Sequence, residues 1–150
     1  MELVSRIREA FPDPGWPADK LATLDADYSC FDTKYVRDHY QGSRWSELTA
    51  KELGWMSQDG WAFNDEAMLY FLPAWMIDDL LRDHDHLAQH KLGRHLEQRR
   101  RYICDHTTRE QQEVILDFFV FTCPGRDEFS EPAVLISELF ERSGRVDERT

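Results

Sequence analysis

The stretch that decides the fold is AMLYFLPAWMIDDLL, residues 67–81. From Ala67 to Ile77 the side chains are apolar except for the Tyr70 hydroxyl and the single N–H of the Trp75 indole, so a helix over these residues has no polar face. A helix that is apolar on all sides is a buried helix. A chain of 150 residues has room for one such central helix, and its other elements must pack around it.

The ends and the middle of this helix carry further signals. Asn64 suits the N-cap position. Pro73 lies in the middle and deprives the Leu69 carbonyl of its usual N–H donor. Two outcomes are open: the helix bends at Pro73, or it breaks and restarts with Pro73 in a first turn. We expect one bent helix that ends at Ile77 or shortly after.

Apolar residues recur at helical spacing on both sides of the central helix. The expected helices cover residues 2–11, lie within 29–42, cover about 50–56 and about 86–100, and lie within 107–125 and 130–144. Capping boxes support two of these starts: Thr49 with Glu52, and then either Thr107 with Glu110 or Thr108 with Gln111. The expected inward residues include Leu3, Ile7, Val36 and His39, and in the late helix Val114, Ile115, Phe118, Phe119, Phe121 and Thr122.

No segment alternates apolar and polar residues for long enough to predict a sheet. The sequence therefore predicts an all-α fold, a single-domain compact bundle of about six or seven helices around a central proline-bent apolar helix. This domain is expected to cover residues 1–150, with a flexible tail after residue 144.

The composition is acidic, with 29 Asp and Glu against 18 Lys and Arg, a net charge of -11 and a pI of about 4.9. Such a surface repels phosphate backbones and anionic lipid, so we expect neither a nucleic-acid partner nor a membrane. Its natural partners are basic proteins. The absence of an export signal pattern, and three widely spaced cysteines, favour a cytoplasmic protein with thiols rather than disulfides.

Common catalytic and nucleotide-binding motifs are absent, and the one metal-like feature is a histidine cluster. This cluster consists of His84, His86, His90 and His95, followed by Cys104 and His106. His86 and His90 would share a helix face, but the surroundings are charged and the closed ligand spacing of a structural zinc site is missing. We predict a solvated polar surface with no metal, cofactor or catalytic residue; the alternative is a small metal-dependent enzyme that uses the His84–His106 cluster.

Four carboxylates gather at the end of the central helix: Asp78, Asp79, Asp83 and Asp85. The helix dipole is negative there, so acids at this end cost stability. A chain that tolerates this arrangement gains something by it, and we predict that these four residues bind a basic partner. The alternative is that Arg82 and the basic segment 91–101 neutralise them internally.

Two motifs resemble a family of small, uncharacterised bacterial cytoplasmic helical proteins. The first is a G-x-R-W-x-x-L turn at Gly42, Arg44, Trp45 and Leu48, and the second is the core-helix run Tyr70, Phe71, Leu72, Pro73, Ala74 and Trp75. The resemblance covers roughly residues 28–82 and implies a fold and a bacterial source, with no activity to carry over. It also implies that Trp45 packs beside the Pro73 bend.

Small size, strong acidity and the absence of catalytic motifs favour a non-enzymatic binding protein. Its most concrete form is a cytoplasmic immunity or inhibitor protein that neutralises a basic partner such as a bacterial toxin. The alternatives are the metal-dependent enzyme and a helical domain of housekeeping role.

Overall fold

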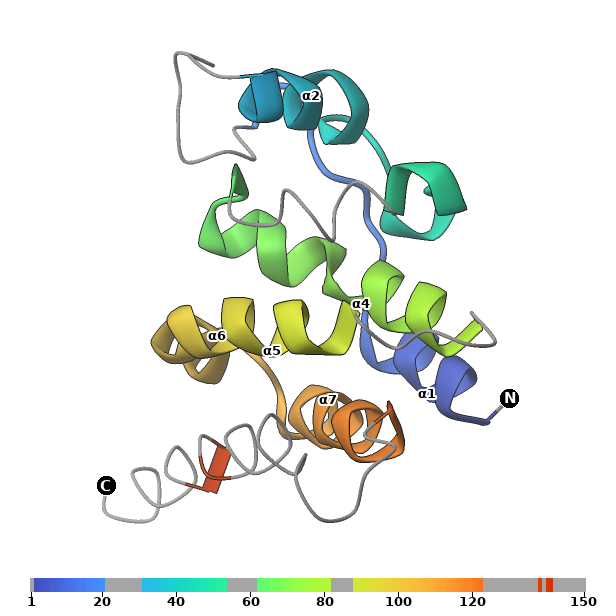
Figure 1. Ribbon diagram of the computed structural model, residues 1–150, viewed down its shortest axis with the longest axis vertical. Coiled ribbons are helices and arrows are strands. Elements are labelled where there is room, and N and C mark those ends of the chain that lie inside the picture. Colours follow the sequence, from blue (N-terminus) through green and yellow to red (C-terminus); the bar gives the residue numbers. More distant parts are fainter. Residues whose placement is uncertain are drawn as a thin grey trace. The chain divides into compact units, whose positions relative to one another are not determined.

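The computed structural model describes residues 2–20, 31–53, 62–81 and 88–122, together with residues 138, 140 and 141. Figure 1 shows its elements: α1 (Glu2–Ala10), α2 (Phe31–Tyr40), the 3-10 turn η1 (Trp45–Glu47), α4 (Asp65–Leu81), α5 (Ala88–Gln98), α6 (Arg100–His106) and α7 (Arg109–Thr122). No strand lies in this described part of the chain, and the prediction of an all-α fold is confirmed.

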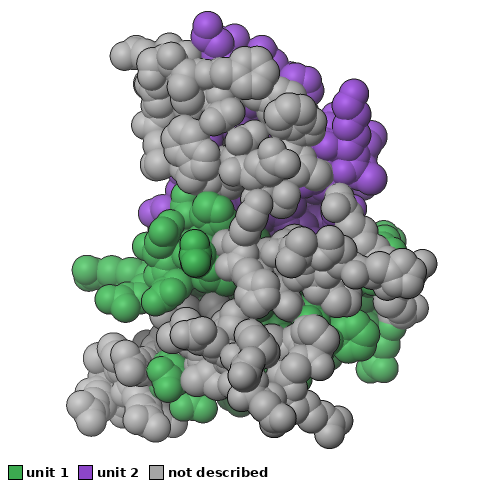
Figure 2. Space-filling view, viewed as in Figure 1, with its two compact units in different colours: residues 1–10, 79–150 green, residues 11–78 purple. Residues whose placement is uncertain are grey.

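The chain divides into two compact units, which Figure 2 colours separately. Residues 11–78 form one unit, which contains all five tryptophans and is called the tryptophan unit below. Residues 1–10 and 79–150 form the other, called the second unit. The single-domain organisation stays a prediction.

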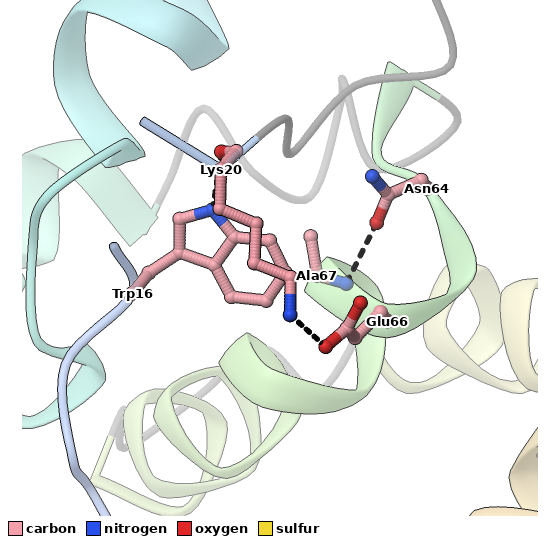
Figure 3. Close-up of polar contacts among 5 residues, drawn as sticks. All are labelled: Trp16, Lys20, Asn64, Glu66 and Ala67. Carbon is pink, nitrogen blue, oxygen red and sulfur yellow. Dashed lines mark hydrogen bonds and ion pairs between the residues drawn. The ribbon is translucent and has the colours of Figure 1, made fainter. Parts of the chain in front are cut away.

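Helix α4 is the buried helix that the sequence predicts. Its start is capped by Asn64, whose Oδ1 accepts a hydrogen bond from the Ala67 N–H at 2.9 Å. Figure 3 shows this cap. Every residue from 71 to 77 is buried, which fits a helix with no polar face. Pro73 lies inside one continuous helix, so the alternative of a break and restart is wrong. The helix also runs on to Leu81, one turn beyond Ile77.

Aromatic rings fill the core of the tryptophan unit. Phe71 of α4 lies 5.6 Å from Tyr40 of α2, 5.7 Å from Phe63 and 6.1 Å from Trp16, between ring centroids. Trp75, one turn further along α4, meets Phe63 edge to face at 5.8 Å. Tilted and edge-to-face pairs at these distances add to the stability that burial alone provides.

A capping box and a left-handed glycine fix two helix ends in this unit. Glu52 and Thr49 form the predicted capping box: the Thr49 N–H donates to Glu52 Oε2 at 2.7 Å, and the Glu52 N–H donates to Thr49 Oγ1 at 3.3 Å. The helix that begins at Ala50 is described as far as Leu53. After α2, Gly42 has a φ of 82°, the left-handed conformation expected of a glycine at C′.

In the second unit, α1 packs against α7. Val4, Ile7 and Ala10 of α1 are buried, as are Val114, Ile115, Phe118, Phe119 and Thr122 of α7. At the edge of this contact Arg6 forms an ion pair with Asp117 at 2.7 Å. Gln111 Nε2 donates to the Ala10 carbonyl at 2.9 Å, which closes the end of α1. The cap of α7 is the Thr108–Gln111 box, the second of the two predicted alternatives.

Several details differ from the predictions. Phe121 was expected inside but is 64% exposed, because at 100° per residue it lies roughly 90° from the centre of the buried face of α7. His39 is exposed and Tyr40 takes the inward position instead, while Leu3 is half-buried and its neighbour Val4 is buried.

The expected helix over about 86–100 is confirmed as α5 (Ala88–Gln98). Residue Arg99, with φ -106° and ψ 20°, separates α5 from α6. Helix α6 was not predicted as an element of its own, and it buries Ile103. Of the expected helix within 130–144, residues 138, 140 and 141 are helical and the rest lies outside the described residues. None of the described helices has the length and apolar character needed to cross a bilayer.

Candidate functional site

The four carboxylates predicted to bind a partner do not form one exposed patch. Asp79 is only 1% exposed, and its expected surface position is wrong. The physical reason is that α4 continues past Ile77, so Asp79 follows Leu72 and Trp75 at helical spacing on a buried face. Asp78 is half-buried. Asp83 and Asp85 lie outside the described residues.

The histidine cluster is only partly described. His84 and His86 lie outside the described residues, and of His90 only the helical backbone is described. His95 is half-buried, with Nδ1 at 3.4 Å from Nη1 of Arg99. His106 stacks on the Tyr102 ring at 3.9 Å, and its Nδ1 lies 2.8 Å from the Tyr102 carbonyl oxygen. Within the described ranges no three potential metal ligands come together.

A polar cluster that the sequence did not predict lies in the tryptophan unit. The half-buried Asp13 carboxylate accepts three hydrogen bonds: from the Ser46 N–H at 3.1 Å, from the Ser46 hydroxyl and from the Tyr70 hydroxyl. We call Asp13, Ser46 and Tyr70 the Asp13 cluster. It joins three segments, namely the loop after α1, the turn η1 and the core helix α4.

The hydrogen bonds decide the charge state of this cluster. Burial of the Asp13 carboxylate would by itself raise its pKa, but the bonds from Ser46 and Tyr70 outweigh burial and hold the pKa below its ordinary value of 3.8. Burial, and then the hydrogen bond to Asp13, raise the pKa of Tyr70 above its ordinary value of 10.0. At neutral pH, Asp13 is therefore ionised and Tyr70 is protonated.

Further hydrogen bonds join the same loop to residues 43–45. Arg44 Nη1 donates to the Asp13 carbonyl at 2.6 Å, and Trp45 Nε1 donates to the Pro12 carbonyl at 3.3 Å. The Trp16 N–H donates to the Ser43 carbonyl at 2.9 Å. These bonds explain locally why Arg44 and Trp45 stand together in the G-x-R-W-x-x-L turn. That Trp45 packs beside Pro73 stays a prediction.

The far end of the loop is fixed by Trp16 and Lys20, which Figure 3 shows beside the start of α4. Trp16 Nε1 donates to the Lys20 carbonyl at 2.9 Å. The Lys20 ammonium lies 5.1 Å from the Trp16 ring centroid and forms an ion pair with Glu66. The positive charge of Lys20 is thus stabilised within the same unit by the Trp16 ring and by the Glu66 carboxylate.

The hydrogen bonds of the Asp13 cluster hold the loop in place, and the cluster does not have the features of a general base. A general base needs a pKa near the working pH and a free lone pair directed at a substrate. Asp13 has a lowered pKa, and its two oxygens already accept bonds from Ser46 and Tyr70. The Tyr70 hydroxyl, with its raised pKa, is a donor to that carboxylate. The cluster therefore binds the loop of residues 11–20 to the rest of the unit.

Sequence reasoning missed this cluster because its partners are far apart in the chain. Ser46 lies 33 residues after Asp13, and Tyr70 lies 57 residues after it. The available signal was the Tyr70 hydroxyl itself, which stands alone in an otherwise apolar helix, since a buried tyrosine hydroxyl needs a partner.

Comparison of the chain with models of protein families, with curated proteins and with solved structures finds no match. The family resemblance stays a prediction.

Proposed function

We propose that this chain is a non-enzymatic acidic binding protein whose partner is a basic protein. The most concrete form of this proposal is a cytoplasmic bacterial immunity protein that neutralises a toxin. The observation that carries it is the uneven distribution of charge between the two units.

The tryptophan unit holds most of the excess of negative charge. Residues 11–78 contain 12 acidic and five basic residues, whereas the second unit contains 17 acidic and 13 basic residues. The tryptophan unit therefore carries a formal charge of -7 and the second unit a charge of -4. A surface with this much charge of one sign attracts an oppositely charged protein and speeds its association.

The basic residues of the tryptophan unit are largely engaged within it. Lys20 pairs with Glu66, and Arg37 pairs with Asp38 at 2.8 Å. Arg44 donates to the Asp13 carbonyl. Lys20 and Arg37 thus each neutralise one acid of the same unit, whereas Arg44 bonds to a neutral carbonyl; the remaining acids of the unit outnumber its remaining bases.

Asp19 and Glu47 are the clearest of those remaining acids. Both side chains are exposed, and neither forms an ion pair with another described residue. We propose that they belong to the partner-facing surface together with Asp78. Asp79 is left out, because a buried carboxylate offers no exposed charge to a partner.

The first test asks whether a toxin exists. The open reading frame next to this one is expressed in a bacterial host with and without this chain, and growth is measured. We expect arrest without the chain, recovery with it, and a complex that co-purifies. Growth arrest that this chain does not relieve would contradict the immunity proposal.

The second test asks which surface binds, using two variants with the same change in net charge. One is Asp19→Asn/Glu47→Gln in the tryptophan unit, and the control is Glu9→Gln/Glu110→Gln at exposed positions of the second unit. Association with the captured partner is followed by stopped flow from low to high salt. The proposal requires slower, less salt-sensitive association in the first variant than in the control. Equal rates in the two variants would place the interface elsewhere.

A further inference from the structure

We draw no further inference here: the strongest candidate, the exposed apolar pair Val120 and Phe121 at the C-terminal end of α7, is a helix surface on which nothing in the structure shows what covers it.

Discussion

Replacing Asp13 by asparagine removes the negative charge that accepts three hydrogen bonds, two from Ser46 in η1 and one from Tyr70 in α4. The amide oxygen can still accept from one side, but the amide NH2 faces a hydroxyl or N–H that was donating to the carboxylate. Hydrogen bonds to a charged group contribute about 1.5–3 kcal/mol each, and the half-exposed position favours the lower end. With the equivalent of one to two bonds lost, we expect Asp13→Asn to lower the free energy of unfolding by about 2–3 kcal/mol.

Urea unfolding followed by tryptophan fluorescence reports on the tryptophan unit itself, because all five tryptophans lie in residues 11–78. In a urea titration with an m-value of about 1 kcal/mol/M, the expected loss lowers the midpoint by about 2–3 M. The matched control is Asp19→Asn, a change of the same kind at an exposed position of the same loop. We expect the control to stay within about 0.5 kcal/mol of wild type.

Double-mutant cycles distinguish the cluster from a general effect of charge. Tyr70→Phe and Ser46→Ala should each cost about 1.5 kcal/mol in the wild-type background and clearly less when Asp13 is already asparagine. If Tyr70→Phe costs the same in both backgrounds, the reasoning about the Asp13 cluster is refuted.

The dependence on pH provides an independent check. Because the pKa of Asp13 is lowered in the folded state, its contribution is fully present above the unfolded-state pKa and is lost as the pH falls through the lower, folded-state value. The stability difference between wild type and Asp13→Asn should therefore be constant near neutral pH and shrink below about pH 4. A difference that grows on acidification would have the wrong sign.

Four other outcomes are expected. Asn64→Ala removes the cap of α4 and should cost about 1 kcal/mol in the same urea titration. Gly42→Ala should cost about 1–2 kcal/mol, because φ is 82° and the new Cβ would lie 3.3 Å from Ala18 Cβ. Pro73→Ala should be tolerated or mildly destabilising if Pro73 only bends a packed helix, and should cost about 1–3 kcal/mol if the curvature is needed to place Trp75 and Met76; stabilisation above about 1 kcal/mol would show that a bend at Pro73 serves no structural purpose. Zinc added to the protein should not survive dialysis at stoichiometric amounts; retained zinc that is lost in His86→Ala/His90→Ala would overturn the prediction for the histidine cluster.

The helices were predictable because their signals are local. The N-cap at Asn64, the Thr49–Glu52 box and the left-handed Gly42 each depend on residues within four positions of one another. The burial of α4 could be predicted for a similar reason, since a helix without a polar face is stable only when it is buried on all sides.

The polar contacts could not be predicted in the same way. Asp13 meets Ser46 and Tyr70 only after the loop has folded back, and no spacing rule connects residues that far apart. The error at Asp79 has a different origin. Its charge suggested a helix end, but the helix continued, and an additional turn moved the carboxylate from the surface to a buried face.

The acids of the tryptophan unit therefore differ in what they do for the fold. Asp13 and Glu52 accept hydrogen bonds that hold a loop and a helix start, and Glu66 pairs with Lys20. Asp19 and Glu47 are exposed and make no ion pair within the described residues. Surplus like charge destabilises a compact state by self-repulsion, so folding alone gives no reason to keep them.

This division makes a prediction about stability that is separate from binding. Asp19→Asn/Glu47→Gln should leave the urea midpoint unchanged or raise it slightly, by a few tenths of a kcal/mol at low salt, because it removes repulsion and no bond. The same variant should associate more slowly with a basic partner. A loss of stability above about 1 kcal/mol would mean that these carboxylates serve the fold, and their exposure would then no longer support a partner-facing surface on the tryptophan unit.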